Sequence, residues 1–167
     1  TEYFLDHITD PKTRAFILNY YLDSFKGTLF RQTQFAVFEQ FIHEADAKGE
    51  PLTADTLDDV YGQLNQHYYG DSVEPGGDIA LEWSRIPHFY YNFYVYQYAT
   101  GFAAATALAN KVVHGTDADR DAYLGFLKAG SSDYPTEIMK HAGVDMTKPD
   151  YLEDAFKTFE KRLNEFE

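Results

Sequence analysis

Residues 10–49 read "DPKTRAFILNYYLDSFKGTLFRQTQFAVFEQFIHEADAKG" and decide the fold of this chain. Asp10 before Pro11 is a typical helix start, because the carboxylate caps free amide groups and proline fits the first turn. Apolar side chains then recur at steps of three and four residues, which indicates one face of a helix. Gly49, with a proline two residues later, ends the pattern. The segment therefore predicts a helix of about 37 residues.

Helical patterns also fill most of the rest of the chain. An alternating strand pattern is present only in "NFYVYQY", residues 92–98, and its setting inside a longer helical pattern favours a helix there too. We therefore predict an all-α fold, a bundle of about six to eight helices in a single domain over residues 1–167. "DSVEPGGD", residues 71–78, is expected to be a loop. Helical segments are expected over residues 1–7, 53–70, 79–86, 87 to about 113, 117–130, 131–144 and 148–167.

Several of these boundaries have recognisable caps. Short polar side chains before a helix accept hydrogen bonds from its first free amide groups, and glycine after a helix adopts the backbone angles that stop it. For the helix over residues 53–70, the expected caps are Thr53 and Gly70. The expected cap is Thr116 or Asp117 for the helix over residues 117–130, and Ser132 or Asp133 for the helix that contains Pro135.

Composition and charge limit the partners of the chain. It is 44% hydrophobic and 25% charged, which is typical of a globular protein. Its net charge of −13 repels phosphate groups, which argues against nucleic acid and anionic membrane surfaces as partners. No apolar run reaches the ~18–20 residues of a membrane span, and the first residues carry no signal pattern. We therefore expect a soluble, acidic protein of the cytoplasm.

Metal and nucleophile motifs are missing from the sequence. A zinc peptidase helix needs two histidines four residues apart with a glutamate between them, and no pair among the six histidines has that spacing. "HEADA", residues 43–47, begins like this motif but lacks its second histidine. Glu39, His43 and Asp46 share a helix face, which fits an exposed charged face better than a metal site. The chain has no cysteine, no GxSxG sequence and no phosphate-binding loop, so the sequence predicts no metal ligands in this chain.

The aromatic run "IPHFYYNFYVYQYATG", residues 86–101, is the strongest candidate site. On a helix, His88, Tyr91, Val95 and Tyr98 would share one face. Each buried tyrosine hydroxyl needs a hydrogen-bond partner, so this many tyrosines suggest that some of them line a polar cleft. Hydroxyl groups and a histidine N–H are also the groups that stabilise a developing oxyanion. The alternative is an ordinary aromatic core, and the composition alone favours that reading.

A second candidate is the polar turn inside "GTLFRQTQFAVFE", residues 27–39. Arg31 and Gln32 interrupt an otherwise apolar helix. They either mark its solvent-facing side or point into a cleft, where an arginine can bind a carboxylate or a peptide backbone.

At these two features the chain resembles a known family. It is similar to the carboxyl-terminal part of oligoendopeptidase F, in the thimet-oligopeptidase-like group of zinc peptidases. The resemblance covers almost the whole chain in the order of the family. The matching segments are "TEYFLDHITDPKTRAFILNYYLD", "GTLFRQTQFAVFE", "RIPHFYYNFYVYQYATG" and "SSDYPTEIMKHAGVDMTKPDYLEDAF".

The resemblance implies a fold and a chemistry. Members of this family are all-α, with two helical halves that face each other across a channel for short peptides. Zn²⁺ is held there by the two histidines of an HExxH helix and by a glutamate of the next helix, and the glutamate of the motif acts as general base. In the family these residues precede a stretch similar to "TEYFLDHITD", residues 1–10. We therefore expect a fragment that lacks the metal site, is inactive alone, and has the amino-terminal part of the same protein as its partner.

The resemblance also assigns site residues, since the histidine-and-tyrosine segment of the family matches "HFYYNFYVYQY", residues 88–98. It implies oxyanion stabilisation by Tyr94 and Tyr96. The substrate-binding residues that it implies are His88, Tyr91, Tyr98, Arg31 and Gln32.

A different reading is a complete, non-catalytic helical module whose tyrosine-rich groove holds a peptide or a small apolar ligand. A fragment is expected to expose apolar surface where the rest of its protein packs, whereas a complete module has a closed core. The sequence leaves open the oligomeric state and the length and side-chain preference of the peptides.

Overall fold

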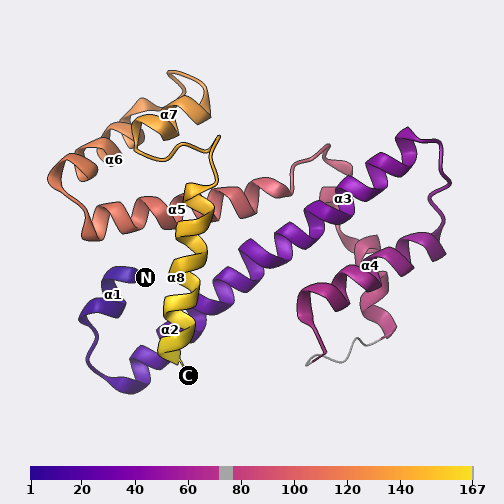
Figure 1. Cartoon of the computed structure of the whole chain (residues 1–167), viewed down its shortest axis with the longest axis horizontal. Helices are drawn as coiled ribbons and strands as arrows, with labels where there is room; N and C mark the ends of the chain where they lie inside the picture. The colour runs from indigo at the N-terminus through magenta and orange to yellow at the C-terminus, as the bar shows by residue number, and fades with distance from the viewer. Residues whose placement is uncertain (72–76, 167) are drawn as a thin grey trace. The chain divides into compact units, whose positions relative to one another are not determined.

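The structure is a computed structural model, which describes residues 1–71 and 77–166. Within these residues the chain forms eight α-helices and no strand, so the predicted all-α fold is confirmed (Figure 1). Most of the predicted loop over residues 71–78 lies outside the described residues. The α-helices are α1 (Glu2–His7), α2 (Pro11–Phe25), α3 (Arg31–Ala47), α4 (Ala54–Tyr69), α5 (Tyr96–His114), α6 (Asp117–Ala129), α7 (Pro135–His141) and α8 (Asp150–Phe166).

The long helix predicted from residue 10 is confirmed. Helix α2, one π-helical segment, η1 (Lys26–Phe30), and α3 follow one another without a break. Asp10 caps the start, because its Oδ2 accepts a hydrogen bond from the backbone N–H of Thr13 at 2.8 Å. Gly49 follows the last turn with a φ of +74°, an angle that glycine adopts without strain. The local signals at both ends therefore set the length of this segment.

The chain divides into two compact units. One consists of Thr1–Lys26 together with Thr100–Glu167, and the other of Gly27–Ala99. We describe each unit by itself, and the single domain expected from the sequence stays a prediction.

The Gly27–Ala99 unit is built around aromatic side chains of α3 and α4. The ring of Phe38 on α3 meets the fully buried ring of Tyr61 on α4 edge to face, with 5.2 Å between centroids. Tyr61 donates a hydrogen bond to Glu82 at 2.7 Å, and burial raises the pKa of this phenol. Glu82 lies on a 3₁₀ segment, η2 (Gly77–Arg85), which packs against α4. The buried core consists of Phe35, Phe38, Leu57, Tyr61, Ile86, Phe89 and Val95.

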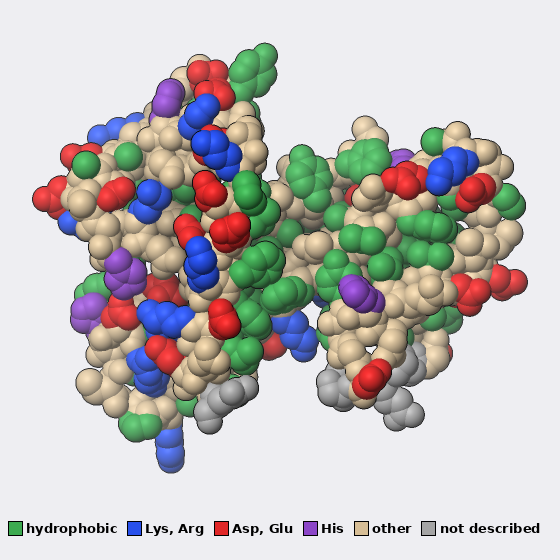
Figure 2. Space-filling model, in the orientation of Figure 1, with side chains coloured by type: hydrophobic (Ala, Val, Ile, Leu, Met, Phe, Trp, Pro, Cys, Tyr) green, Lys and Arg blue, Asp and Glu red, His purple; other side chains and the backbone are tan. Residues whose placement is uncertain are grey.

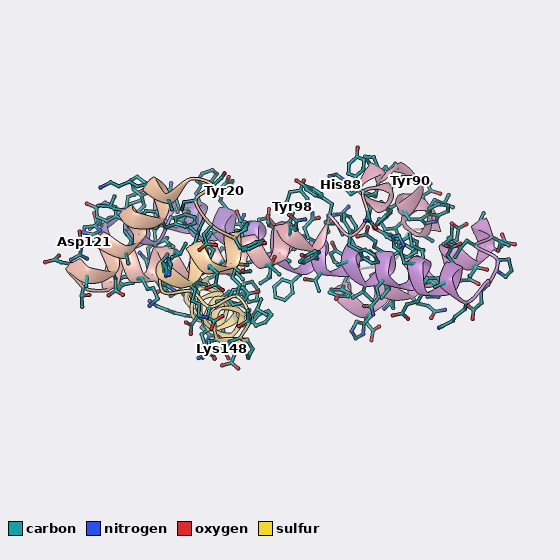
Figure 3. All side chains as sticks on the ribbon, turned by 90° about the horizontal axis from the view of Figure 1, so that it is seen from above. Tyr20, His88, Tyr90, Tyr98, Asp121 and Lys148 are labelled. Carbon is teal, nitrogen blue, oxygen red and sulfur yellow. The ribbon has the colours of Figure 1, made fainter. Side chains whose placement is uncertain are left out.

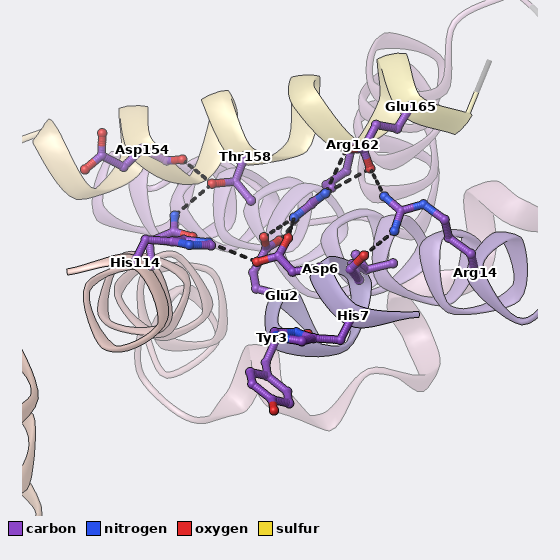
Figure 4. A network of polar contacts seen from close by, with 12 residues as sticks. Glu2, Tyr3, Asp6, His7, Arg14, His114, Asp154, Thr158, Arg162 and Glu165 are labelled. Atoms are coloured by element: carbon purple, nitrogen blue, oxygen red, sulfur yellow. Dashed lines mark hydrogen bonds and ion pairs between the residues drawn. The ribbon is translucent and has the colours of Figure 1, made fainter. Parts of the chain in front are cut away.

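The other unit contains a buried ion-pair network (Figure 4). Arg162 of α8 is only 1% exposed, and it donates hydrogen bonds to the carboxylate of Glu2 on α1. Its Nη1 also donates to Glu165 at 2.9 Å, and Arg14 of α2 contacts the same Glu165 carboxylate at 3.1 Å. Burial opposes the charge of Arg162, but the hydrogen bonds to Glu2 and Glu165 outweigh it and raise the pKa of the guanidinium. The network thus joins three helices of this unit.

The predicted caps are confirmed in three places and wrong in one. Thr53 caps α4, Gly70 ends it with a φ of +65°, and Thr116 caps α6 in a reciprocal arrangement with Asp119. Before α7, however, the N-cap position is Tyr134, without a capping side chain. The Asp133 side chain instead bonds to the adjacent backbone, since its Oδ1 accepts a hydrogen bond from the N–H of Tyr134.

The helix predicted from Pro87 to about Val113 is also wrong, because it is broken near its start. A short 3₁₀ turn, η3 (Pro87–Tyr90), ends before residues 91–95, and α5 begins only after them. Asn92 and Phe93 have φ angles of +50° and +62°, which do not belong to a right-handed helix. The single helix face predicted for the tyrosines therefore does not exist.

Within the described ranges, no helix combines the length and the apolar character that crossing a membrane requires.

Candidate functional site

Four side chains predicted for the site meet around the break before α5. His88 lies on η3, and Tyr98 lies in the first turn of α5. The loop between them, residues 91–95, carries Tyr91 and Tyr94. The ring centroid of His88 lies 5.7 Å from that of Tyr91, 6.1 Å from that of Tyr94 and 5.8 Å from that of Tyr98. We call these four residues the His88 cluster; Figure 3 labels two of them, His88 and Tyr98.

The polar ends of the His88 cluster lie close together. The hydroxyl of Tyr98 lies 3.4 Å from Nε2 of His88, and the rings of Tyr94 and Tyr98 meet edge to face at 5.5 Å. A hydrogen bond with Tyr94 raises the pKa of Tyr98, so this phenol keeps its proton throughout the neutral range. The cluster thus brings an imidazole and three phenol groups, which can donate hydrogen bonds, into one small region.

Burial divides the aromatic run into core and surface. Phe89 and Val95 are buried in the core of their unit, whereas Tyr91, Tyr94 and Tyr98 are 56%, 41% and 39% exposed. The loop therefore turns the tyrosines outward while its neighbours pack inward. The run therefore contributes to the core, and the role of its exposed tyrosines in a site stays a prediction.

Tyr96 lies in a different place from the His88 cluster. It is only two positions before Tyr98 on α5, which directs the two side chains to different sides of the helix. Tyr96 lines a pocket of about 560 Å³, together with His43, Glu39 and Phe93. The structure therefore separates the two tyrosines that the resemblance assigned to oxyanion stabilisation.

Arg31 and Gln32 are engaged within their own unit. The guanidinium of Arg31 forms an ion pair with Glu82 and lies 5.0 Å from the ring centre of Phe35. Desolvation lowers the pKa of Arg31, but its hydrogen bond to the Tyr69 hydroxyl and the charge of Glu82 raise it overall. The Gln32 side chain donates to the backbone carbonyl of residue 27 at 3.3 Å. The structure does not bring either residue to the His88 cluster.

Comparisons with known proteins identify the family of this chain. A sequence model of peptidase family M3 matches residues 2–158. The chain belongs to peptidase family M3. It is 59% identical over 167 residues to the chromosomal oligoendopeptidase F of Lactococcus lactis subsp. cremoris, and 53% identical over 166 residues to oligopeptidase PepF of Bacillus subtilis strain 168. The resemblance to oligoendopeptidase F is thus confirmed.

A solved M3-type structure has the same fold. The crystal structure of oligoendopeptidase-F from Enterococcus faecium matches 99% of this chain with a TM-score of 0.95 and 59% sequence identity. The chain covers 32% of that structure, and 28% and 25% of the lengths of the Lactococcus and Bacillus relatives. It therefore spans roughly a quarter to a third of the M3 proteins that it matches.

The zinc that the resemblance implies does not fit the described part of this M3 chain. Residues 1–71 and 77–166 hold no group of three or more histidine, aspartate or glutamate side chains placed to bind a metal ion. Within these residues, two histidines lie near a carboxylate: Nε2 of His114 is 3.7 Å from Oδ2 of Asp6, and Nε2 of His43 is 4.0 Å from Oε1 of Glu39. The carboxylate of Glu39, however, already accepts a hydrogen bond from the backbone of Phe93.

Sequence reasoning missed the importance of Glu39. It treated this residue as one of several charged residues on an exposed face of α3, but the side chain is only 1% exposed. A signal was present, because Glu39 follows Phe38 and precedes Ile42 in the apolar repeat of the helix. An acid beside the apolar face of a helix is a candidate for burial where it finds a hydrogen-bond partner.

Proposed function

We propose that this chain is the carboxyl-terminal part of a cytoplasmic, zinc-dependent oligopeptidase that hydrolyses short peptides. In this proposal the chain supplies one wall of the substrate channel, and it does not hydrolyse peptides alone. Membership of family M3 and the identity to proteins named oligoendopeptidase F support the peptidase assignment. The observation that carries the assignment of the wall is the convergence of His88, Tyr91, Tyr94 and Tyr98 on one exposed patch.

The proposed role of the His88 cluster is to bind the peptide carbonyl that is attacked. Charge develops on this oxygen in the transition state, and donors already in place stabilise it more than they stabilise the substrate. Tyr94 is the preferred donor, because it is the tyrosine whose ring contacts those of His88, Tyr91 and Tyr98. Tyr96 lies outside this cluster, beside a pocket with Glu39 and His43, so its proposed role as a second donor rests on the resemblance alone.

The proposed zinc belongs to the complete protein. Because the described residues of this chain do not form a three-ligand site, we assign its ligands and the general base to the rest of that protein. The chemistry derived for this chain is limited to binding and orienting the peptide.

Exposed apolar side chains support the proposal that this chain packs against the rest of the complete protein. Hydrophobic side chains reach the surface of both units on the face drawn in Figure 2. Phe16 on α2 is 72% exposed, and a further apolar pocket of about 440 Å³ lies between α5, α6 and the two methionines of the chain, Met139 and Met146. Such surface is typical of a face that packs against another part of a protein.

A chimera tests the proposed function. The matching third of Enterococcus faecium oligoendopeptidase-F is replaced by this chain, and the hydrolysis of a fluorescence-quenched octapeptide is measured with and without a zinc chelator. We expect hydrolysis of the octapeptide, its loss with the chelator, and no cleavage of folded lysozyme. A chimera that folds but hydrolyses nothing would contradict the proposal and would favour a non-catalytic peptide-binding module.

A further inference from the structure

The loop that carries Tyr91 and Tyr94 has an unfavourable backbone conformation. Asn92 and Phe93 are consecutive non-glycine residues with φ angles of +50° and +62°. Asparagine tolerates this region because its short side chain can bond locally, but phenylalanine does not. A conformation of this kind persists only where surrounding groups hold it, and it is often found at functional sites. The structure must therefore contain a group that holds residues 91–95.

Glu39 is the group in contact with this loop. Its Oε1 accepts a hydrogen bond from the backbone N–H of Phe93 at 2.8 Å, across 54 residues of sequence. His43, one turn later on α3, places its ring 4.3 Å from the ring of Phe93 at an interplanar angle of 33°. The loop is thus fixed at Phe93 by an amide contact on one side and a ring contact on the other.

The burial of Glu39 is costly for the stability of the fold. Only 1% of its side chain is exposed, and within the described residues its one ion-pair contact is with His43 at 4.0 Å. A buried carboxylate without a strong cationic partner loses more free energy of hydration than its new contacts return. An apolar side chain would therefore stabilise the adjoining aromatic core better. The presence of an acid at this position is therefore better explained by its hydrogen bond to the loop than by any gain in the stability of the core.

We propose that Glu39 is a positioning residue of the His88 cluster. By binding the Phe93 amide, its carboxylate sets the turn that carries Tyr91 and Tyr94 to His88. Glu39 itself touches no substrate in this proposal. Its effect on catalysis rests on the proposed function, whereas its effect on the loop does not.

Two substitutions of Glu39 in the chimera separate positioning from structure. Glu39→Leu removes the acceptor, and we expect kcat for the octapeptide to fall about 10- to 100-fold with a smaller change in KM, because displaced donors lose most of their effect in the transition state. Glu39→Gln keeps an oxygen that accepts the Phe93 N–H, so we expect kcat within about threefold of the parent. The melting temperature of the Leu variant should not fall, since a buried charge has been removed.

Glu44 offers a matched control. It lines the same pocket five residues later on α3, but its side chain is exposed and accepts a hydrogen bond from Gln40 at 2.7 Å. Glu44→Leu should leave kcat and KM unchanged. An equal loss of kcat in the Glu44 and Glu39 variants would overturn the proposal, because it would show a general effect of acidic charge in the pocket.

Hydrogen exchange provides a readout that does not depend on activity. Mass spectrometry on a peptide covering residues 91–95 of the chimera should show exchange at Phe93 that is about tenfold faster or more in Glu39→Leu, and nearly unchanged in Glu39→Gln. If the unsubstituted chimera is folded but inactive, the proposed function fails while this measurement still tests the loop. Unchanged exchange in Glu39→Leu would overturn the positioning role, whatever the activity.

Discussion

At the scale of single residues, Tyr94, like His88, contacts all three other rings of the His88 cluster. Its ring lies within 6.4 Å of the rings of His88, Tyr91 and Tyr98, and its hydrogen bond raises the pKa of Tyr98. The raised pKa means that the Tyr98 phenol is a donor, rather than a phenolate, throughout the neutral pH range. The property to test is therefore the ability of each tyrosine hydroxyl to donate a hydrogen bond.

Removing the Tyr94 hydroxyl tests the proposed oxyanion role. Tyr94→Phe in the chimera should lower kcat by about 100- to 1,000-fold, as the loss of one oxyanion donor does in other enzymes. The melting temperature should stay the same, because the ring contacts remain. The same measurement on Tyr96→Phe tests the second proposed donor.

Tyr90 is the matched control for this experiment. It lies in the same run but is 83% exposed, so Tyr90→Phe should leave kcat within about twofold. Unchanged turnover in both Tyr94→Phe and Tyr96→Phe would refute the oxyanion assignment.

At the scale of elements, the ends of the helices behave as local chemistry dictates. The hydroxyl of Thr116 accepts from the N–H of Asp119 at 3.3 Å, and the Asp119 carboxylate accepts from the N–H of Thr116 at 2.8 Å. The hydrogen bond from the Thr116 hydroxyl, and then the one from its backbone N–H, lower the pKa of Asp119 below its usual value. Since the folded pKa is the lower one, this stabilisation is present above the unfolded pKa and is lost as the pH falls through the folded value.

Substitution at the cap of α6 should therefore have a pH-dependent effect. Thr116→Ala should lower the free energy of unfolding by about 1 kcal/mol at pH 7, measured by urea denaturation of the chain. The difference from the parent should shrink as the pH falls through the folded pKa of Asp119, where protonation of this carboxylate weakens the cap in the parent as well. Thr116→Ser keeps the hydroxyl and serves as the control. A penalty that stays the same over this pH range would show that Asp119 plays no part.

At the scale of the whole molecule, the ion-pair network joins the first and last helices of the described chain. Arg162 and Glu2 are 160 residues apart in sequence, and both side chains are buried. The pair is a weak source of net stability, because both charges lose hydration. Removal of one partner is expected to be strongly destabilising, since the other charge then stays buried without a counter-charge.

A double-substitution cycle measures this coupling. Arg162→Met should destabilise the chain by about 3–5 kcal/mol, because it leaves the Glu2 carboxylate buried without its partner. Adding Glu2→Gln should recover part of that loss, so that the double variant is more stable than the sum of the single effects predicts.

Lys157→Met is the control on the same helix. Its ion pairs with Glu153 and Asp154 are exposed, so the expected change is within about 0.5 kcal/mol. Additive effects of Arg162→Met and Glu2→Gln would contradict the coupling.

The sequence by itself determined the fold class and most helix boundaries. Helix caps act on backbone groups within one turn of themselves, so the adjacent sequence is enough to predict them. This holds for Asp10, Thr53, Gly70 and Thr116. The sequence also determined the family, because the matching segments run through the whole chain.

The tertiary structure alone decided the geometry of the candidate site. The break at residues 91–95 depends on Glu39, 54 residues away, and the helical pattern of the run contains no sign of it. The same holds for Arg31, whose partner Glu82 is 51 residues distant. Side chains that are far apart in sequence meet only when the core closes, and that meeting, rather than helical spacing, brings the tyrosines to His88.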